Sequence, residues 1–328
     1  MSKTLKFLVV DTETATLPLC SEMANDAESK KKLAIAKPLV YDIGWNITNR
    51  KGDILDHKQF LVAETFCVPQ IFNTAYYAEK RPIYLGMLER GETTIKTWDE
   101  IMAIFMQDMR TVDAVGAFNS MFDFKKAIPF TELYIRNLYS PRYQEWEKIQ
   151  RESCARILNN NKPERNPDFD ADNFFFRGEK FPLFDLWGLA AKILLNNPTY
   201  KKNCLDHDLL SASGLYFKTS AESTYQYICD KYDFCESHTA LDDATIETFI
   251  LSKIASRHAI STGIIFFPFR ELGETVEFIT RRKNPDANEC EKVMNAIKIH
   301  LDSKEEDTPY YSKMEKKLDM ILEYVGRK

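Results

Sequence analysis

Long hydrophobic runs are missing from this sequence. Of its 328 residues, 44% are hydrophobic and 28% are charged, and no apolar run approaches the ~20 residues that a membrane-spanning helix requires. The first residues, Met-Ser-Lys-Thr-Leu-Lys, lead directly into an apolar segment and leave no room for a signal peptide. We therefore expect a globular protein of the cytoplasm that has no membrane partner.

Paired cysteines and an excess of basic residues are also missing. The seven cysteines are odd in number and scattered along the chain, which indicates free thiols in a reducing compartment rather than a disulfide framework. The net charge of −5 argues against a broad basic face that binds duplex nucleic acid without sequence preference. It still allows an enzyme that holds a few nucleotides at the end of a strand.

The most informative segment present is Phe7-Leu-Val-Val-Asp-Thr-Glu13, an apolar run that ends in two carboxylates. Its composition predicts a strand at Leu5–Val10 that is buried on both faces. Alternate side chains of a strand share a face, so Asp11 and Glu13 should point the same way. Two unpaired carboxylates in that place repel each other, and a divalent cation such as Mg²⁺ relieves the repulsion. The alternative is a strand that simply ends in solvent.

Two later segments also combine apolar residues with residues that can bind metal or accept a proton. The first reads Val-Gly-Ala-Phe-Asn-Ser-Met-Phe-Asp-Phe and contains Asn119 and Asp123. The second reads Ser-His-Thr-Ala-Leu-Asp-Asp-Ala and places His238 five residues before Asp243. Asp243 should project from the first turns of an amphipathic helix, while His238 lies in the loop before that helix.

In this order, Asp-x-Glu, Asn-x-x-Phe-Asp and His-x-Ala-Leu-x-Asp-Ala resemble the motifs of the DEDDh exonucleases, the family of the proofreading subunit of bacterial replicative polymerase. All five residues that name the family's site have a counterpart, namely Asp11, Glu13, Asp123, His238 and Asp243. The resemblance is confined to islands within residues 1–258. It implies a ribonuclease-H-like α/β fold, with a mixed five-stranded sheet flanked by helices.

The resemblance also implies a chemistry. Family members release nucleotides from 3′ ends with two Mg²⁺ or Mn²⁺ ions per site, which implies that Asp11, Glu13, Asp123 and Asp243 are metal ligands and that Asp11 bridges both ions. His238 is the implied general base, because an imidazole that is neutral near pH 7 can accept a proton from the attacking water. Activity should therefore rise with pH as this histidine loses its proton.

The expected substrate is the 3′ end of single-stranded DNA, and a replication or repair protein is the expected partner. The resemblance implies that Thr12, Thr14 and Asn119 bind this substrate, with Asn119 bracing the second motif rather than holding metal. An exoribonuclease is one alternative, because the shape of the pocket decides whether a 2′-OH is accepted. A non-catalytic nucleic-acid-binding protein on the same fold is another, but it should have lost one of the five residues, and none is lost.

The apolar segments, the short polar connections between them and, for Trp98–Met109, helical spacing predict further elements of the first 258 residues. Strands are expected at Leu39–Ile47, Ile54–Val62 and Ala114–Phe118, and helices at Trp98–Met109 and Phe124–Tyr134. Asp185 is expected to cap the apolar helix that follows it rather than to bind metal.

Two regions fall outside the resemblance. A large insertion at residues 140–180 should contain a charged helix from Gln144, an exposed Asn/Pro loop at 159–167 and an aromatic run, Phe174–Pro182. That run either anchors the insertion to the domain or stacks on bases. Residues 259–328 are expected to form a C-terminal α+β extension, with a strand-like run at Gly263–Phe269 and helices near Asn288–Leu301 and Tyr311–Val325. The basic cluster at 281–283 contacts either phosphate or solvent.

Overall fold

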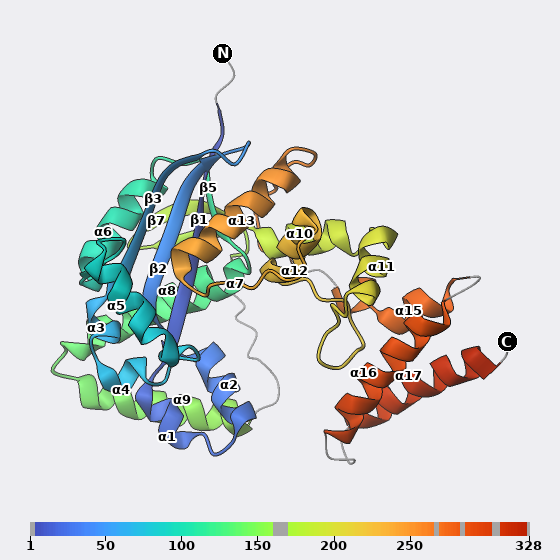
Figure 1. Ribbon diagram of the computed structural model, residues 1–328. Coiled ribbons are helices and arrows are strands. Elements are labelled where there is room, and N and C mark those ends of the chain that lie inside the picture. The colour runs from blue at the N-terminus through green and yellow to red at the C-terminus, as the bar shows by residue number, and fades with distance from the viewer. Residues whose placement is uncertain (1–3, 160–169, 266–268, 283–285, 304–308, 327–328) are drawn as a thin grey trace. The chain divides into compact units, whose positions relative to one another are not determined.

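The computed structural model describes residues 4–159, 170–265, 269–282, 286–303 and 309–326. Contacts divide the chain into two compact units (Figure 1). We call residues 1–187 and 236–265 the sheet unit, and residues 188–235 and 266–328 the helical unit. Each unit is built from two separate stretches of chain, a different division from the boundary expected at residue 258.

The strands are β1 (Lys6–Thr16), β2 (Pro38–Asn49), β3 (Ile54–Val62), β4 (Thr94–Lys96), β5 (Ala114–Ala117), β6 (Asn173–Phe176) and β7 (Glu179–Asp185). The helices before β6 are α1 (Pro18–Met23), α2 (Ala27–Ala36), α3 (Ala63–Phe66), α4 (Pro69–Phe72), the 3-10 helix η1 (Ala78–Lys80), α5 (Arg81–Glu89), α6 (Trp98–Met109), α7 (Ser120–Phe122), the π-helical segment η2 (Asp123–Ala127), α8 (Ile128–Leu138) and α9 (Tyr143–Asn159). The later helices are α10 (Leu186–Leu194), α11 (Pro198–Asp206), α12 (Ala221–Cys229), α13 (Ala240–Ala255), α14 (Phe269–Leu272), α15 (Thr275–Thr280), α16 (Ala287–Asp302) and α17 (Pro309–Gly326).

The sheet unit is an α/β structure around a mixed seven-stranded sheet with the strand order β4-β3-β2-β1-β5-β7-β6. β1 lies at its centre, antiparallel to β2 and parallel to β5. The number of five strands, which the resemblance implied, is wrong: β4 and β6 extend the sheet at its two edges, and neither they nor β7 were predicted from the sequence. β6 arises from the aromatic run of the insertion, where Phe174 and Phe176 are buried and Phe175 is exposed. That alternation favours the anchoring interpretation of this run.

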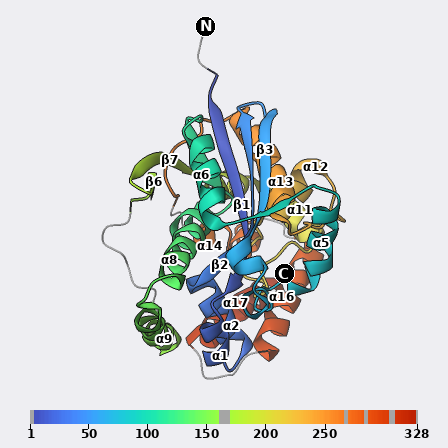
Figure 2. The same cartoon turned by 90° about the vertical axis from the view of Figure 1, so that its left-hand side faces the viewer.

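Helices cover both faces of the sheet. Figure 2 shows α6 and α8 on one side of β1 and β2, and α13 on the other. α6 spans the predicted residues, because its apolar positions recur at helical spacing and because Thr97 and Glu100 form a capping box at its start. Leu8 and Val10 of β1 belong to the same buried core as the apolar residues of α6. Alternate side chains of a strand share a face, so Asp11 and Glu13, at odd positions, lie on the opposite face, which α13 covers.

The position of α13 is fixed by two residues of β2. Gly44 lies so close to the helix that a Cβ atom would be 2.4 Å from the backbone nitrogen of Leu241. Two residues away on the same face, the buried Asp42 accepts a hydrogen bond from the backbone nitrogen of Ala240 at 2.9 Å. Burial raises the pKa of Asp42 to about 6, and the hydrogen bonds from Ala240 and Gln59 oppose that rise. α13 therefore begins directly over the sheet.

The helical unit packs α11, α12 and α14–α17 around their own apolar residues, among them Val276, Ile279, Val293 and Ile297. The expected α+β character of residues 259–328 is wrong for the part that the structure describes, which contains helices and isolated bridges only. Val276 and Ile279 bury one side of a helical turn, so 275–280 forms α15. α16 and α17 lie where helices were predicted. The Asn/Pro loop, from residue 160 on, and Lys283 lie outside the described residues.

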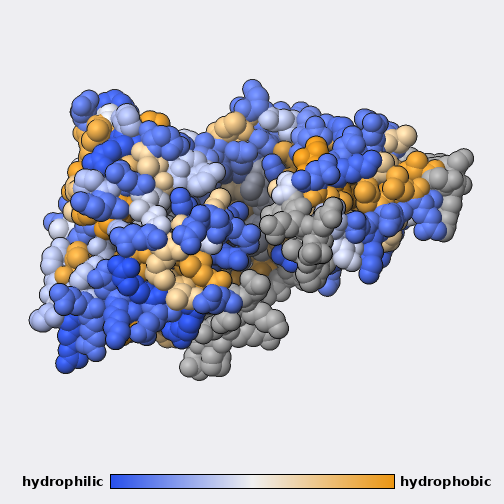
Figure 3. All heavy atoms as spheres, turned by 90° about the horizontal axis from the view of Figure 1, so that it is seen from below, coloured by the Kyte–Doolittle hydropathy of each residue, from blue (hydrophilic) through white to orange (hydrophobic). Residues whose placement is uncertain are grey.

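The surface and the thiols agree with the composition. On the face shown in Figure 3, hydrophilic residues predominate and hydrophobic ones form smaller groups between them. None of the seven cysteines, all of which lie in the described residues, forms a disulfide. Among the described residues, no helix is both long enough and apolar enough to cross a membrane.

Candidate active site

The four predicted metal ligands meet in the sheet unit. Asp11 and Glu13 lie on β1, Asp123 begins η2, and Asp243 lies in the first turn of α13. Burial raises the pKa of Asp11 well above its usual value, and repulsion from its carboxylate neighbours, Asp123, Glu13 and Asp243 among them, raises it further. The pKa of Glu13 is raised in the same way, first by burial and then by Asp243.

A fifth carboxylate, Glu247, joins this cluster and was not predicted. It lies one turn after Asp243 on α13 and is 3% exposed. Its Oε2 accepts a hydrogen bond from the backbone nitrogen of Phe118 at 3.0 Å. Burial and then Asp123 raise its pKa, and Glu247 is itself the carboxylate with the largest effect on Asp11. The i, i+4 spacing from Asp243 was the available signal, because such residues share one face of a helix.

Asp123 is held in an irregular segment rather than at the start of a regular helix. The expected helix at Phe124–Tyr134 is divided into η2 and α8, and π-helical turns of this kind are frequent at functional sites. Asp123 is 3% exposed, and Thr12 donates a hydrogen bond from its Oγ1 to the Asp123 Oδ1 at 2.6 Å. Burial raises the pKa of Asp123 to about 7, against the effect of that hydrogen bond.

The three expected substrate-binding residues lie in different surroundings. The Thr12 side chain braces Asp123. Thr14 lines a pocket of about 660 Å³, together with Lys31 and Tyr76. Asn119 has a left-handed backbone, with φ 80°, and directly precedes α7, a conformation that asparagine tolerates better than most residues. Their contact with a substrate stays a prediction.

Asp185 ends β7 and directly precedes α10. Its buried carboxylate accepts a long hydrogen bond, 3.4 Å, from the backbone nitrogen of Ser120. It also raises the pKa of Asp123. Asp185 therefore lies near the second motif, and its role as the cap of α10 stays a prediction.

His238 lies in the loop before α13, as predicted, and two tyrosines hold it. The Tyr77 ring stacks on the imidazole, with centroids 4.2 Å apart, and its hydroxyl lies 3.0 Å from Nε2. The Tyr84 hydroxyl donates to the backbone oxygen of His238 at 3.3 Å. His238 Nδ1 lies 3.8 Å from Asp243 Oδ2. Sequence analysis missed both tyrosines because more than 150 residues separate them from His238.

The donor set fits a hard divalent cation. Glu13, His238 and Asp243 each offer one ligand atom, and these three atoms lie within 4.8 Å of one another. Asp243 Oδ1 is buried without a hydrogen-bond partner. Burial and repulsion from Glu236 raise the pKa of Asp243 to about 8. Among the described residues, no Lys or Arg forms an ion pair with the cluster, so a cation with oxygen ligands would relieve its repulsion.

The site is therefore a cluster of five carboxylates and one imidazole, drawn from β1, η2, α13 and the loop before α13. No protein-family model, curated protein or solved structure matches this chain. The side chains of the cluster and their surroundings are the basis for assigning a function.

Proposed function

We propose that this protein is a metal-dependent 3′→5′ exonuclease of the DEDDh type, which releases nucleotides from single-stranded DNA. One observation carries the proposal: the carboxylates of three motifs, separated by more than 100 residues each time, lie in one buried cluster beside His238. Unpaired carboxylates with raised pKa values are costly in a folded protein and gather at functional sites. The mixed arrangement of β3, β2, β1, β5 and β7 supports the ribonuclease-H-like fold as part of this proposal.

Asp11, Glu13, Asp123 and Asp243 would hold two Mg²⁺ or Mn²⁺ ions, and Glu247 is placed to assist them. When bound, such ions stabilise negative charge on the phosphoryl group and lower the pKa of water. The chain itself fixes the ligands. Thr12 orients Asp123, and the backbone of Phe118 orients Glu247.

His238 is the proposed general base. Its imidazole is held between the Tyr77 ring and the Asp243 carboxylate. If the Tyr77 hydroxyl donates to Nε2, the imidazole proton is on Nδ1 and faces the carboxylate, which stabilises that tautomer. The Nε2 lone pair is then available to a water molecule that takes the place of the hydroxyl, so this nitrogen is the one that would accept the proton.

The pocket beside β1 supports a single-stranded substrate. It begins at Thr14, one residue after Glu13, and α2 contributes Lys30 and Lys31 to its lining. Two aromatic side chains, Tyr76 and Phe122, also line it, and Tyr76 is 85% exposed. Lysines suit phosphates, and aromatic rings suit unpaired bases whatever their sequence.

The proposal is tested with single-stranded DNA and RNA labelled at the 3′ or the 5′ end, each incubated with Mg²⁺, Mn²⁺ or EDTA. We expect mononucleotides to be released from the 3′ end of DNA with either metal and none with EDTA. The Asp11→Asn variant should lower the rate by more than ~100-fold. Loss of a residue that only supports a metal ligand costs up to about 100-fold, and Asp11 is itself a proposed ligand. Asp302→Asn, at an exposed position of α16, is the matched control.

Several outcomes would contradict the proposal. Release from the 5′ end would exclude the stated polarity. Faster cleavage of RNA than of DNA would mean that RNA is the substrate, while the proposed mechanism would still hold. Full activity of Asp11→Asn with Mg²⁺ would remove the site assignment.

A further inference from the structure

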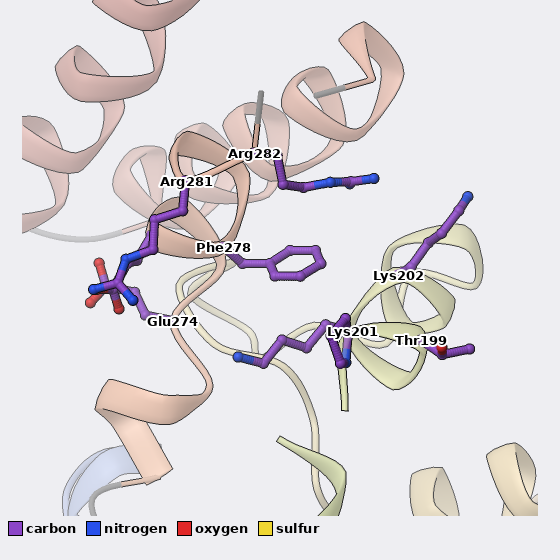
Figure 4. A pocket seen from close by; sticks show the side chains of 9 residues that line it. Thr199, Lys201, Lys202, Glu274, Phe278, Arg281 and Arg282 are labelled. Carbon is purple, nitrogen blue, oxygen red and sulfur yellow. The ribbon is translucent and has the colours of Figure 1, made fainter. Parts of the chain in front are cut away.

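The helical unit contains a basic pocket of its own. The pocket has a volume of about 550 Å³ and lies between α11 and α15 (Figure 4). Four cationic side chains line it, Lys201 and Lys202 from α11 and Arg281 and Arg282 from the end of α15, together with the half-buried ring of Phe278.

Two carboxylates also line the pocket, and each is already in an ion pair. Glu277 forms an ion pair with Arg281, and Glu274 forms one with Lys317. The two lysines of α11 remain. Lys202 forms a long ion pair with the exposed Asp206, with its Nζ 3.6 Å from the Asp206 Oδ2.

The side-chain amine of Lys201 has neither a hydrogen bond nor an ion pair in the part of the chain that the structure describes. Its Nζ lies 5.6 Å from the centroid of the Phe278 ring. Burial lowers its pKa, because the amine has lost part of its hydration. An anionic ligand would restore a partner to this charge.

Arg282 is fixed in place. It forms an ion pair with Glu289, which is 4% exposed, and its guanidinium carbon lies 5.3 Å from the Phe278 centroid. In the view of Figure 4, Arg282 runs above the ring and Lys201 below it, while Lys202 ends farther from the ring. The cations therefore do not converge on one point, as a site for a single phosphate would require. Their spread suits several phosphates in a row.

We propose that the helical unit binds the phosphate backbone of a single-stranded nucleic acid in this pocket, through Lys201, Lys202 and Arg282. The identity of the ligand rests on the proposed exonuclease function. The first turn of α11 adds little to the binding, because the Asn197 side chain already accepts the hydrogen bond of the Thr199 backbone nitrogen. A free mononucleotide carries the same phosphate chemistry, so the test includes it.

The experiment measures the binding of a fluorescent single-stranded DNA oligonucleotide to the full chain in EDTA, which prevents cleavage, at several salt concentrations. The variant is Lys201→Gln/Lys202→Gln, and the matched control is Lys192→Gln/Lys231→Gln, at two exposed lysines of the same unit. The lysines are chosen over Arg282 because its loss would leave the buried Glu289 unpaired.

For the pocket variant, we expect the dissociation constant to rise about tenfold and the slope of log K against log salt to become shallower by about 1.4, because each phosphate contact in a single strand contributes about 0.7. The control variant should bind as the wild type does. Turnover of a labelled dinucleotide with Mg²⁺ should be unchanged in both variants.

The outcomes separate this inference from the proposed function. If the wild type cleaves DNA but the pocket variant keeps its affinity and salt dependence, the inference is overturned and the exonuclease stands. If the wild type never cleaves but binds DNA through the two lysines, the exonuclease proposal fails and the pocket stands. Displacement of the oligonucleotide by dAMP at an equal phosphate concentration would overturn the backbone assignment in favour of a mononucleotide site.

Discussion

In the sheet unit, Asp123, Asp243 and Glu247 are buried close to one another, and no Lys or Arg among the described residues pairs with them. In the helical unit, the buried Glu289 is paired with Arg282. The second arrangement is the ordinary solution for a buried charge, since an ion pair offsets part of its lost hydration. The first raises the free energy of the folded state, and under the proposed function a cation would offset it. The two units therefore differ in whether the chain itself supplies the counter-charge to its buried carboxylates.

The largest expected effect comes from a comparison in which one histidine of each unit is replaced in turn. His238→Ala should lower the turnover of single-stranded DNA by roughly 10²–10⁴-fold, the usual contribution of general acid–base catalysis. Stabilisation by metal should survive, because all five carboxylates remain. His207→Ala is the control, since His207 is an exposed residue of the helical unit that stacks on Tyr232. Single-turnover rates of both variants at pH 7.5 provide the measurement, and near wild-type cleavage by His238→Ala would remove the general base.

The second effect concerns divalent cations and pH. Adding Mn²⁺ to EDTA-treated protein should raise the melting temperature, because the ion binds the folded cluster and not the unfolded chain. At 100 times its dissociation constant, one ion contributes about 2.7 kcal/mol to the free energy of unfolding. Asp11→Ala should reduce the rise. An unchanged melting temperature in the wild type would count against a metal site.

The metal-free protein should also depend on pH in a definite direction. The folded pKa values of Asp123 and Asp243, about 7 and about 8, lie above the ordinary value of 3.8, so the folded state binds more protons than the unfolded state between about pH 4 and 8. Their contribution is present below pH 4 and is lost as the pH rises through the folded pKa values. Stability in EDTA should therefore fall from pH 5 to pH 8, and Mn²⁺ should restore more of it at pH 8. Melting curves at both pH values, with EDTA and with Mn²⁺, measure this.

The smallest expected effects are two changes of opposite sign in the free energy of unfolding. In EDTA at pH 8, Asp243→Asn should raise the free energy of unfolding by about 1 kcal/mol, because it removes one charge from a repulsive cluster. Glu289→Gln should lower it by about 1–2 kcal/mol, less than for a fully buried pair, because Arg282 is partly exposed. Urea unfolding of both variants measures the difference. The same sign for both substitutions would mean that the two units do not differ as described.

Local sequence was sufficient for several elements and for the candidate ligands. α6 spans the predicted residues because its apolar positions repeat with the period of a helix, which a short window contains. β3 also spans the predicted residues, with its apolar residues grouped at its two ends. Asp11, Glu13, Asp123, His238 and Asp243 could be selected because each lies in a short motif. Their common position on one face was predicted for Asp11 and Glu13 alone, from the alternation of a strand.

Features that depend on contacts between distant segments were decided by the tertiary structure alone. β1 continues to Thr16, past both carboxylates, because β2 pairs with it beyond a bulge at Glu13. Tyr77 reaches His238, and Gly44 lets α13 approach the sheet, through contacts that no local pattern encodes. The two basic segments of the helical unit, near residues 201 and 281, meet in one pocket only after folding. Side-chain periodicity is a property of neighbouring residues, whereas a site made of distant segments depends on how the whole chain packs.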